Sequence, residues 1–417
     1  MANDDATMVI VGAGLAGGKA AQALREGGFS GRVVLVGDET ERPYERPPLS
    51  KEYLQGRAER DSVFVHPSDW YGEHDVELRS GVRVTAVDRD AHEVVLADGE
   101  RLGYTKLLLT TGASPRRLPV PGTELEGVHY LRTLADSDRI AAALRSSART
   151  VVVGAGWIGL EVTAAARIAD VPATVIESAP LPLLRVLGPE IAEVFAALHR
   201  EHGVDLRCET DLSEIVGRDG RVAGVRLADG SEIEADAVVI GIGVAPDTEL
   251  AEAAGLQVDD GVVVDAHHRS SDPDIHAAGD VARLWHPAFE RHLRVEHWAN
   301  ALNGGPAAAR AMLGDEEAAY DRLPYFFTDQ YDLGMEYTGY TGPGQYDEVV
   351  VRGDLQAREF VAFWLSGGRV QAGMNVNIWD VTDAISRLVR SPEPVDTARL
   401  ADPAVPLDEV LGGGAAG

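Results

Sequence analysis

The chain has 417 residues, of which 45% are hydrophobic, and this length is enough for two or three globular domains. Its formal net charge of −29 argues against nucleic-acid binding, because recognition of phosphates requires a basic surface. No apolar run approaches the roughly 20 residues of a membrane-spanning helix, and the first residues are acidic where a secretory signal would be basic. We therefore expect a cytoplasmic protein.

The first predicted unit begins with a phosphate-binding fingerprint. The apolar residues 8–11 predict a buried strand, and the sequence G-A-G-L-A-G follows at 12–17. In such a turn the first glycine permits the tight bend, the second lets a pyrophosphate approach the backbone, and the third lets helix and strand pack. A second strand at 32–36 is followed by Asp38, an acceptor for a ribose 2′-hydroxyl. The segment therefore predicts a bound dinucleotide.

A proline-rich loop follows this unit. Pro47 and Pro48 predict a stiff loop rather than a helix, with Ser50 as the N-cap of a helix that begins at Lys51. Further along, the sequence predicts strands at 82–87, 94–97 and 107–109, a proline-marked linker from 115 to 121, and a helix at 135–146.

The same fingerprint then occurs a second time. A strand at 151–153 precedes G-A-G-W-I-G at 154–159, and a strand at 173–176 ends at Glu177. The hairpin and the apolar strand at 237–242 that follow repeat the architecture of the first unit. Two loops predict two dinucleotides, and we infer that electrons pass between them. The alternative is that both turns only pack a helix on a sheet.

The last third of the chain changes in character. Strands are predicted at 262–264 and 275–277, the latter leading into Gly279, Asp280 and a helix that begins near Val281. A helix at 300–313 follows. From Leu323 aromatic residues cluster and strand-like runs alternate, which predicts a separate α+β domain, and we expect the tail at 412–417 to be disordered.

The cysteine and histidine content limits the kinds of redox and metal site that the chain could form. The single cysteine, Cys208, excludes an intrachain disulfide and a redox-active cysteine pair, and its strand-like surroundings predict a small core residue. His199 and His202 are spaced for one helix face, but two histidines without a third ligand indicate a solvated face rather than a metal site. We predict no metal.

Taken in order, the motifs resemble those of the NADH-dependent ferredoxin reductases that serve bacterial oxygenases. The matching segments, which span essentially the whole chain, are the loop at 12–17, R-P-P-L-S-K at 46–51, T-G at 111–112, the loop at 154–159 with Glu161, A-G-D at 278–280, E-H-W at 296–298 and T-D-Q at 328–330. The resemblance implies an α/β, glutathione-reductase-like fold with two Rossmann-like domains and a C-terminal α+β domain. It implies a split FAD-binding domain (1–115 and 246–322), an inserted NADH-binding domain (116–245) and a C-terminal domain (323–417).

The resemblance also implies which residues contact tightly bound FAD and the co-substrate NADH. The expected FAD positions are Ala16, Asp38, Lys51, Val84, Arg132, Asp280 and Trp298, and the expected NADH positions are Ile158, Gly159, Glu161, Glu177, Arg185, Gly243 and Glu296. The cofactor-binding set is completed by the motif residues Gly12, Gly14, Leu15, Gly17, Arg46, Thr111, Gly112, Gly154, Gly156, Trp157, Gly279, His297 and Phe327.

Lys51 and Glu161 are the predicted catalytic residues. In the related flavoenzymes these positions pair beside the flavin, where the ammonium would stabilise the anionic reduced ring and Glu161 would keep it charged. Trp157 would cover the flavin until nicotinamide displaces it, or would simply pack between domains. Phe327 occupies a position where a relative has Trp beside the flavin.

Charged side chains predict both the choice between NADH and NADPH and the docking of the electron acceptor. Glu177 would repel a 2′-phosphate, which favours NADH over NADPH. With no thiol available, we expect electrons to leave to an external iron–sulfur ferredoxin, and Arg283, Arg291, Arg294 and Arg310 are the candidate docking residues. Alternative functions are an NADH oxidase, a rubredoxin reductase, or a redox-responsive binding protein like the apoptosis-inducing-factor relatives.

Overall fold

The computed structural model describes residues 5–315 and 319–411, so the tail predicted at 412–417 lies outside the described residues. The chain forms two compact units. Unit 1 comprises residues 1–46, 59–114 and 244–324, and unit 2 comprises residues 47–58, 115–243 and 325–417. The three-domain boundaries given above stay a prediction. No helix within the described ranges has the length and apolar character needed to cross a membrane.

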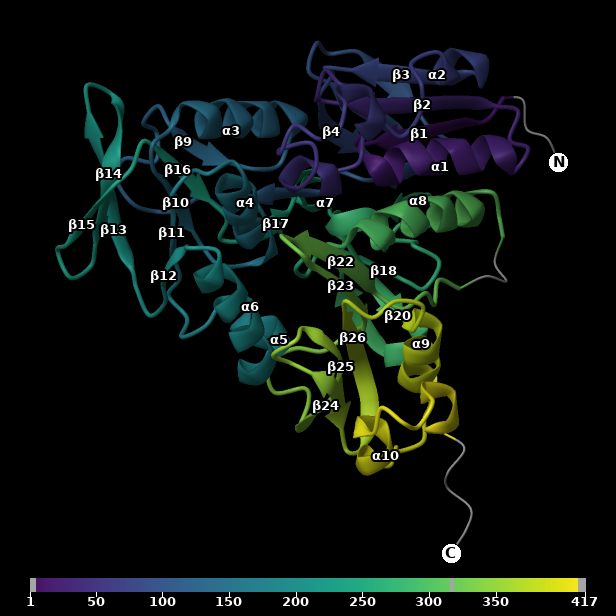
Figure 1. Ribbon diagram of the computed structural model, residues 1–417. Helices are drawn as coiled ribbons and strands as arrows, with labels where there is room; N and C mark the ends of the chain where they lie inside the picture. Colours follow the sequence, from purple (N-terminus) through teal and green to yellow (C-terminus); the bar gives the residue numbers. More distant parts are fainter. Residues whose placement is uncertain (1–4, 316–318, 412–417) are drawn as a thin grey trace, which may run out of the picture. The chain divides into compact units, whose positions relative to one another are not determined.

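Unit 1 is built on a parallel sheet of five strands in the order β19-β7-β1-β2-β3, and Figure 1 labels β1, β2 and β3 of it. Its strands are rich in Val, Leu and Ile because both faces of a parallel sheet are covered. The bounds are β1 (Thr7–Val11), β2 (Arg32–Gly37), β3 (Val76–Ser80), β7 (Lys106–Leu109) and β19 (Ile275–Ala277).

Two helices cover one face of this sheet, and they lie side by side in Figure 1. They are α1 (Leu15–Glu26) and α8 (Trp298–Met312). A Cβ at Gly305 of α8 would lie 2.1 Å from the Ala16 carbonyl oxygen of α1, so this contact requires glycine.

Smaller elements complete unit 1. A three-stranded antiparallel sheet, a two-stranded sheet and a three-stranded mixed sheet are present. Their bounds, with the remaining short helices, are η2 (Arg60–Val63), α2 (Trp70–Glu73), β4 (Val84–Asp88), β5 (Glu93–Leu96), β6 (Arg101–Gly103), β8 (Ala113–Pro115), β17 (Val244–Pro246), α7 (Glu249–Ala253), β18 (Val262–Val264), η3 (Gly279–Val281), β20 (Ala282–His286), η4 (Pro287–Phe289) and β21 (Arg291–Arg294).

Unit 2 repeats the architecture. Its parallel sheet has the order β12-β11-β10-β16-β9, and a three-stranded antiparallel sheet β13-β14-β15 stands where unit 1 has β4-β5-β6. The repeat predicted from the sequence is therefore present. The bounds are β9 (Val128–Tyr130), α3 (Leu134–Ser146), β10 (Thr150–Val153), α4 (Trp157–Ile168), β11 (Ala173–Ile176), α5 (Leu184–Leu187), α6 (Pro189–Glu201), β12 (Asp205–Arg207), β13 (Leu212–Arg218), β14 (Arg221–Leu227), β15 (Glu232–Glu234) and β16 (Ala237–Ile240).

Unit 2 also contains the C-terminal α+β part. Five antiparallel strands in the order β22-β23-β26-β25-β24 share one hydrophobic core with α4 and α6. The indole of Trp364, fully buried on β25, donates to the Leu187 carbonyl at 3.1 Å. The bounds are β22 (Tyr325–Gln330), β23 (Leu333–Gly339), β24 (Glu348–Asp354), β25 (Glu359–Ser366), β26 (Arg369–Val376), α9 (Thr382–Arg390), α10 (Thr397–Ala401) and η5 (Leu407–Glu409).

Three local predictions were wrong. Pro47–Ser50 forms a 3₁₀ helix, η1, because proline fits a first helical turn where no N–H is needed. No regular helix begins at Lys51, since residues 51–56 are turns, so Ser50 is not its N-cap. Asp280 likewise precedes no long helix, because η3 ends at Val281 and strand β20 follows directly.

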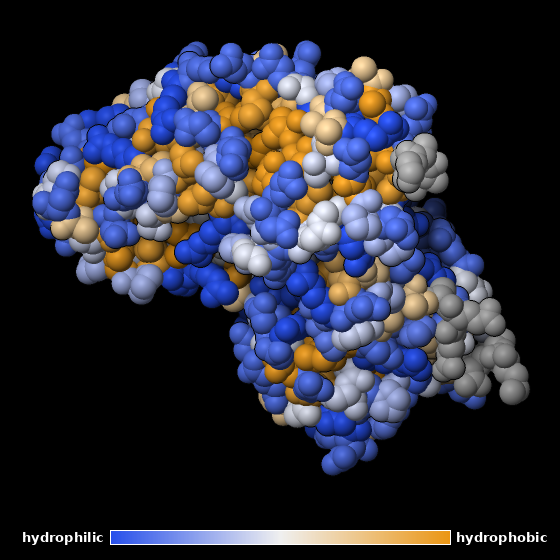
Figure 2. Space-filling model, turned by 90° about the horizontal axis from the view of Figure 1, so that it is seen from below, coloured by the Kyte–Doolittle hydropathy of each residue, from blue (hydrophilic) through white to orange (hydrophobic). Residues whose placement is uncertain are grey.

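The surface is mixed in hydropathy. Hydrophilic residues occupy much of the face shown in Figure 2, with apolar residues exposed between them. Among the residues that the structure describes, the exposed large hydrophobic side chains are Ile158, Ile168, Trp285, Trp379 and Leu411.

Unit 1 buries two histidines almost completely. His268 is 2% exposed, and its Nδ1–H donates to the Ala277 carbonyl at 3.0 Å. His276 is 1% exposed, and neither of its ring nitrogens has a hydrogen-bond partner among the described residues. Burial lowers the pKa of His268 to about 4 and that of His276 to about 3, so both rings are neutral in the folded protein.

Acid should therefore destabilise the fold. Because the folded pKa values lie below the ordinary 6.5, the unfolded chain binds more protons as the pH falls from 7 to 5, and each ring should remove about 2 kcal/mol of unfolding free energy. Denaturant unfolding at the two pH values measures this. His276→Leu should lose about 2 kcal/mol less than the wild type over that interval.

A matched control is His92→Asn, which removes an exposed histidine at a left-handed position that Asn tolerates. It should keep the wild-type pH dependence. Equal pH dependence in His276→Leu and the wild type would contradict the assignment.

Candidate functional site

The first glycine loop joins β1 to α1. A Cβ at Gly12 would lie 2.1 Å from the Thr110 carbonyl oxygen, and one at Gly17 would lie 2.1 Å from the Gly12 carbonyl oxygen. A Cβ at Gly14 would meet nothing within 4 Å. The first and third glycines are thus required by the protein's own backbone, whereas the second faces open space, as a loop that receives a pyrophosphate requires.

The second loop, between β10 and α4, has the same geometry. A Cβ at Gly154 would lie 2.4 Å from the Gly241 carbonyl oxygen, and one at Gly159 would lie 2.1 Å from the Gly154 carbonyl oxygen. Again nothing lies within 4 Å of a Cβ at Gly156. Both loops therefore fit a dinucleotide phosphate at a helix N-terminus.

Asp38 and Glu177 follow β2 and β11, as expected, but their hydrogen-bond and ion-pair partners differ. Glu177 accepts hydrogen bonds from the backbone N–H groups of Ala155 and Ala179, both at 2.8 Å, so its carboxylate is held against the second loop. Asp38 is exposed and pairs with Arg83 at 3.1 Å. Glu177 is thus positioned beside its loop by its own hydrogen bonds.

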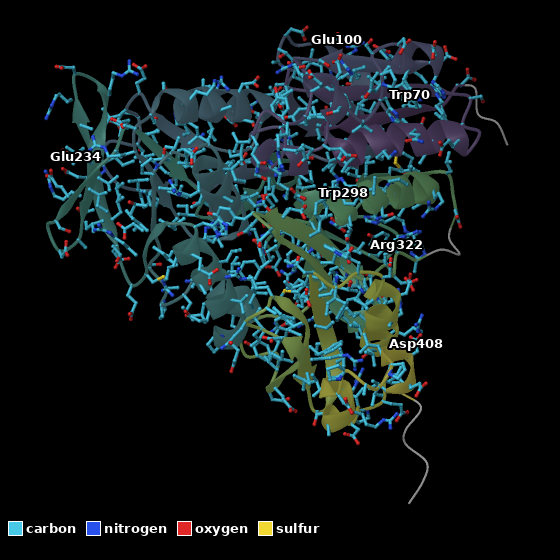
Figure 3. The ribbon with its side chains drawn as sticks, in the orientation of Figure 1. Trp70, Glu100, Glu234, Trp298, Arg322 and Asp408 are labelled. Atoms are coloured by element: carbon cyan, nitrogen blue, oxygen red, sulfur yellow. The ribbon has the colours of Figure 1, made fainter. Side chains whose placement is uncertain are left out.

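A second part of the predicted FAD set surrounds Asp280 in unit 1. Burial acts to lower the pKa of Arg46, but Tyr44, Glu39 and Asp280 outweigh it and raise that pKa. Burial lowers the pKa of His297 to about 4, with Asp280 acting in the opposite direction. Figure 3 labels Trp298 at the first turn of α8, next in sequence to His297. The structure thus brings Arg46, Asp280 and His297 together.

The predicted catalytic pair lies in unit 2. Lys51 Nζ is 2.8 Å from Glu161 Oε1, and the two residues are only 7% and 3% exposed. Glu161 also accepts from Ser50 Oγ and from Thr328 Oγ1, each at 2.5 Å. Two neutral hydroxyls and one ammonium therefore satisfy a buried carboxylate, as a buried charge requires.

Three segments hold this carboxylate. Glu161 projects from α4, Ser50 ends η1, and Thr328 lies on β22. The η1 segment is fixed to α3 by the Ser137 hydroxyl, which donates to the Leu49 carbonyl at 2.8 Å. The ammonium of Lys51 also lies 5.4 Å from the centre of the Phe327 ring, within reach of a cation–π contact.

Trp157 occupies the first position of α4. Its ring packs edge-on against Phe195 at 5.5 Å and against Phe326 at 5.1 Å between ring centres. This contact matches the packing alternative stated above, and the flavin-covering role stays a prediction.

The remaining predicted residues fall into the two units as follows. Leu15, Ala16, Val84, Thr111, Gly112, Gly279 and Glu296 lie in unit 1, and Arg132, Ile158, Arg185 and Gly243 lie in unit 2. Thr111 donates to the Asp247 carbonyl at 2.8 Å, and Glu296 pairs with Arg294.

The sequence missed a buried polar group that is linked to Glu161 through Gln330 and Thr328. His199 was expected on a solvated face, but it is fully buried and contacts Gln330 and Tyr331. The T-D-Q motif at 328–330 was a signal that could have found it, because Thr328 and Gln330 alternate onto one face of a strand.

The surroundings of Cys208 bear on its reactivity. Cys208 is half-buried, and burial raises the pKa of its thiol, which disfavours a reactive thiolate. Within residues 5–315 and 319–411, no group of three or more His, Cys, Asp or Glu side chains could hold a metal ion.

Two parallel-sheet units, each with a loop shaped for a dinucleotide phosphate, define an oxidoreductase of the two-dinucleotide class. The family model described as pyridine nucleotide-disulphide oxidoreductase matches residues 6–305, and the one described as reductase C-terminal matches residues 325–411. The chain therefore belongs to the pyridine nucleotide-disulphide oxidoreductase family, whose members use FAD and NAD(H).

Individual relatives indicate a more specific kind of protein than the family models do. The chain is 40% identical to putidaredoxin reductase of Pseudomonas putida, over 98% of this chain and 97% of that one. It is 42% identical to the ferredoxin–NAD(+) reductase component of the anthranilate 1,2-dioxygenase system of Burkholderia cepacia, over 97% and 98%. The solved covalent complex of putidaredoxin reductase with putidaredoxin superposes with a TM-score of 0.94 at 39% identity, covering 99% of both chains. The predicted family, fold class and cofactors are thus confirmed.

The loop geometry predicts different effects for neighbouring glycines. Gly14→Ala adds a methyl group where the chain leaves open space, so folding should be unaffected while FAD binding weakens at least about tenfold. Gly17→Ala forces a Cβ into backbone and should destabilise the fold itself. Thermal unfolding of the apoprotein and FAD titration separate the two effects.

The second loop supplies the control. Gly156→Ala should leave FAD content unchanged and weaken NADH binding, since it makes the same change in the other loop. Equal loss of FAD in Gly14→Ala and Gly156→Ala would contradict the assignment of one cofactor to each loop.

Proposed function

We propose that this protein is an NADH:ferredoxin reductase that supplies electrons, one at a time, to an iron–sulfur ferredoxin serving a haem or Rieske-type oxygenase. The observation that carries the proposal is a chain with two dinucleotide loops and one half-buried cysteine. Two dinucleotides without a thiol pair support electron exit to another protein. The named relatives, reductase components of oxygenase systems, support the same partner class.

FAD, when bound, would accept a hydride from NADH and release its electrons singly. The protein's part is to bind and orient the cofactors. The loop at 12–17 with Asp38, Arg46 and Asp280 would hold FAD, and the loop at 154–159 with Glu177 would hold NADH. A carboxylate at Glu177 accepts from a ribose diol and repels a 2′-phosphate, which supports NADH over NADPH.

Lys51 would act through charge. Its ammonium is buried and paired, so it enters the reaction already desolvated and oriented, and it would stabilise negative charge on the reduced flavin. Glu161 would keep Lys51 in place and charged. Both roles are those proposed from the sequence, and the 2.8 Å ion pair supports them.

The ferredoxin would dock on a positively charged surface, and Arg283, Arg291, Arg294 and Arg310 are the proposed contacts. Two of them are already paired with carboxylates. Arg283 contacts Asp259, and Arg294 contacts Asp260 and Glu296, which lowers the net positive charge of this surface.

Reconstitution tests the function. NADH with a two-iron ferredoxin and cytochrome c should give ferredoxin-dependent cytochrome reduction that is much faster than oxygen consumption, with a lower rate from NADPH. Raising the salt concentration should slow the ferredoxin step, because docking is electrostatic. A rate that is the same with and without ferredoxin would favour an oxidase.

Lys51→Met should slow reduction of bound flavin by NADH about a hundredfold, measured by stopped-flow absorbance, because an oriented charge is lost. This variant leaves Glu161 buried without its cation, so Lys51→Met/Glu161→Gln should recover stability but not rate. Lys106→Met is the matched control, since it removes the lysine that pairs with Asp274 at 2.7 Å. A wild-type rate in Lys51→Met would remove this role.

A further inference from the structure

A continuous row of buried side chains extends from Glu161 away from Lys51. Thr328 Oγ1 lies 2.5 Å from Glu161 Oε1, and Gln330 Nε2 lies 3.3 Å from Thr328 Oγ1. Gln330 Oε1 lies 2.9 Å from His199 Nε2, and His199 Nδ1 lies 3.2 Å from the Tyr331 hydroxyl. The row joins α4, β22 and α6, and all of it belongs to unit 2.

Burial isolates most of this row from solvent. Thr328 is 1% exposed, and Gln330 and His199 are fully buried, so water does not compete for their hydrogen bonds. Tyr331 is half-buried, and its ring stacks on His202 at 3.6 Å between ring centres. Burial lowers the pKa of His199 to about 4, so the ring is neutral near pH 7 and carries one N–H.

When the Thr328 hydroxyl donates to the Glu161 carboxylate, the direction of every other hydrogen bond in the row follows. An ionised Glu161 can only accept, so the Thr328 hydroxyl donates to it and in turn accepts from Gln330. The Gln330 amide then faces Thr328 with its NH₂ group and His199 with its oxygen. His199 must therefore carry its proton on Nε2, and Nδ1 accepts from the Tyr331 hydroxyl.

Between Thr328 and Tyr331, the row can also form with every hydrogen bond reversed, because each donor would still have an acceptor. With the His199 proton on Nδ1, the ring would donate to Tyr331 and accept from Gln330, whose amide would be reversed. The Thr328 hydroxyl would then donate to Gln330 Oε1, and Glu161 would lose one of its three donors. The His199 tautomer and the donor at Glu161 are therefore coupled.

We propose that Gln330 and His199 are positioning residues for the Lys51–Glu161 pair, which hold the Thr328 hydroxyl in the orientation that donates to the Glu161 carboxylate. This inference rests on the proposed function for its effect on rate, but the tautomer itself does not depend on activity. Reciprocally, the charge of Glu161 holds His199 in the Nε2–H form.

The first test is nitrogen NMR of the ¹⁵N-histidine-labelled holoenzyme near pH 7, with His199→Gln identifying the resonance. The wild type should show a protonated Nε2 and an unprotonated Nδ1. In Glu161→Gln the amide can donate to Thr328, so a substantial share of the Nδ1–H form should be present. An Nδ1–H wild type, or a tautomer unchanged in Glu161→Gln, would overturn the proposal.

The second test is the stopped-flow rate of flavin reduction by NADH. Gln330→Met and Thr328→Val should each be about tenfold slower, while Thr328→Ser should return to within about twofold of the wild type. Tyr325→Phe is the matched control, because it removes a hydroxyl of the same strand that donates to Glu336 at 2.7 Å instead of joining the row.

The outcomes separate the two proposals. A wild type that NADH does not reduce would contradict the proposed function, while the tautomer measurement would still decide the coupling. A normal wild type with Thr328→Val as fast as Tyr325→Phe would overturn the positioning role alone. Gln330→Met could also lower only the melting temperature and leave the rate of flavin reduction and the His199 tautomer normal. That result would also overturn the positioning role.

Discussion

The buried carboxylate of Glu161 is the constraint on which the organisation of unit 2 depends. A charge that is 3% exposed is tolerated only when its oxygens are satisfied, and Ser50, Lys51 and Thr328 supply the donors. These donors come from two segments that lie more than 100 residues before and after Glu161 in sequence. Satisfying one carboxylate therefore ties η1 and β22 to α4, and it places Lys51, Phe327 and the T-D-Q motif around the same point.

Much of this could be predicted from the sequence because the signals were local. Each glycine fingerprint is a strand, a turn and a helix within about 20 residues. The contacts that require Gly12 and Gly154 are not local, because they are made with the backbone of Thr110 and Gly241. Lys51 and Glu161 were identified through a family resemblance rather than by spacing, since nothing in a single sequence shows that residues so far apart meet.

The errors arose where tertiary contacts overrode local pattern. Ser50 resembles an N-cap, but its hydroxyl is taken by Glu161, so the following residues turn instead of forming a helix. The A-G-D motif resembles a strand-to-helix turn, yet the chain continues as β20, which pairs with β18 and β21. His199 resembles a solvated residue on α6 until the face of β22 that covers it is known.

The distribution of these residues between the units bears on how the proposed catalysis would be organised. Lys51, Glu161 and every group that orients them belong to unit 2, whereas the first glycine loop and Asp280 belong to unit 1. The ammonium is therefore held by unit 2 alone and does not rely on the residues proposed to bind FAD in unit 1. A preorganised charge needs no reorganisation when negative charge develops, which is the condition under which an electrostatic contribution to rate is largest. The row of hydrogen bonds through Thr328 and Gln330 extends this preorganisation to α6. The neutral, buried His199 would thereby help to orient the Glu161 carboxylate that pairs with Lys51.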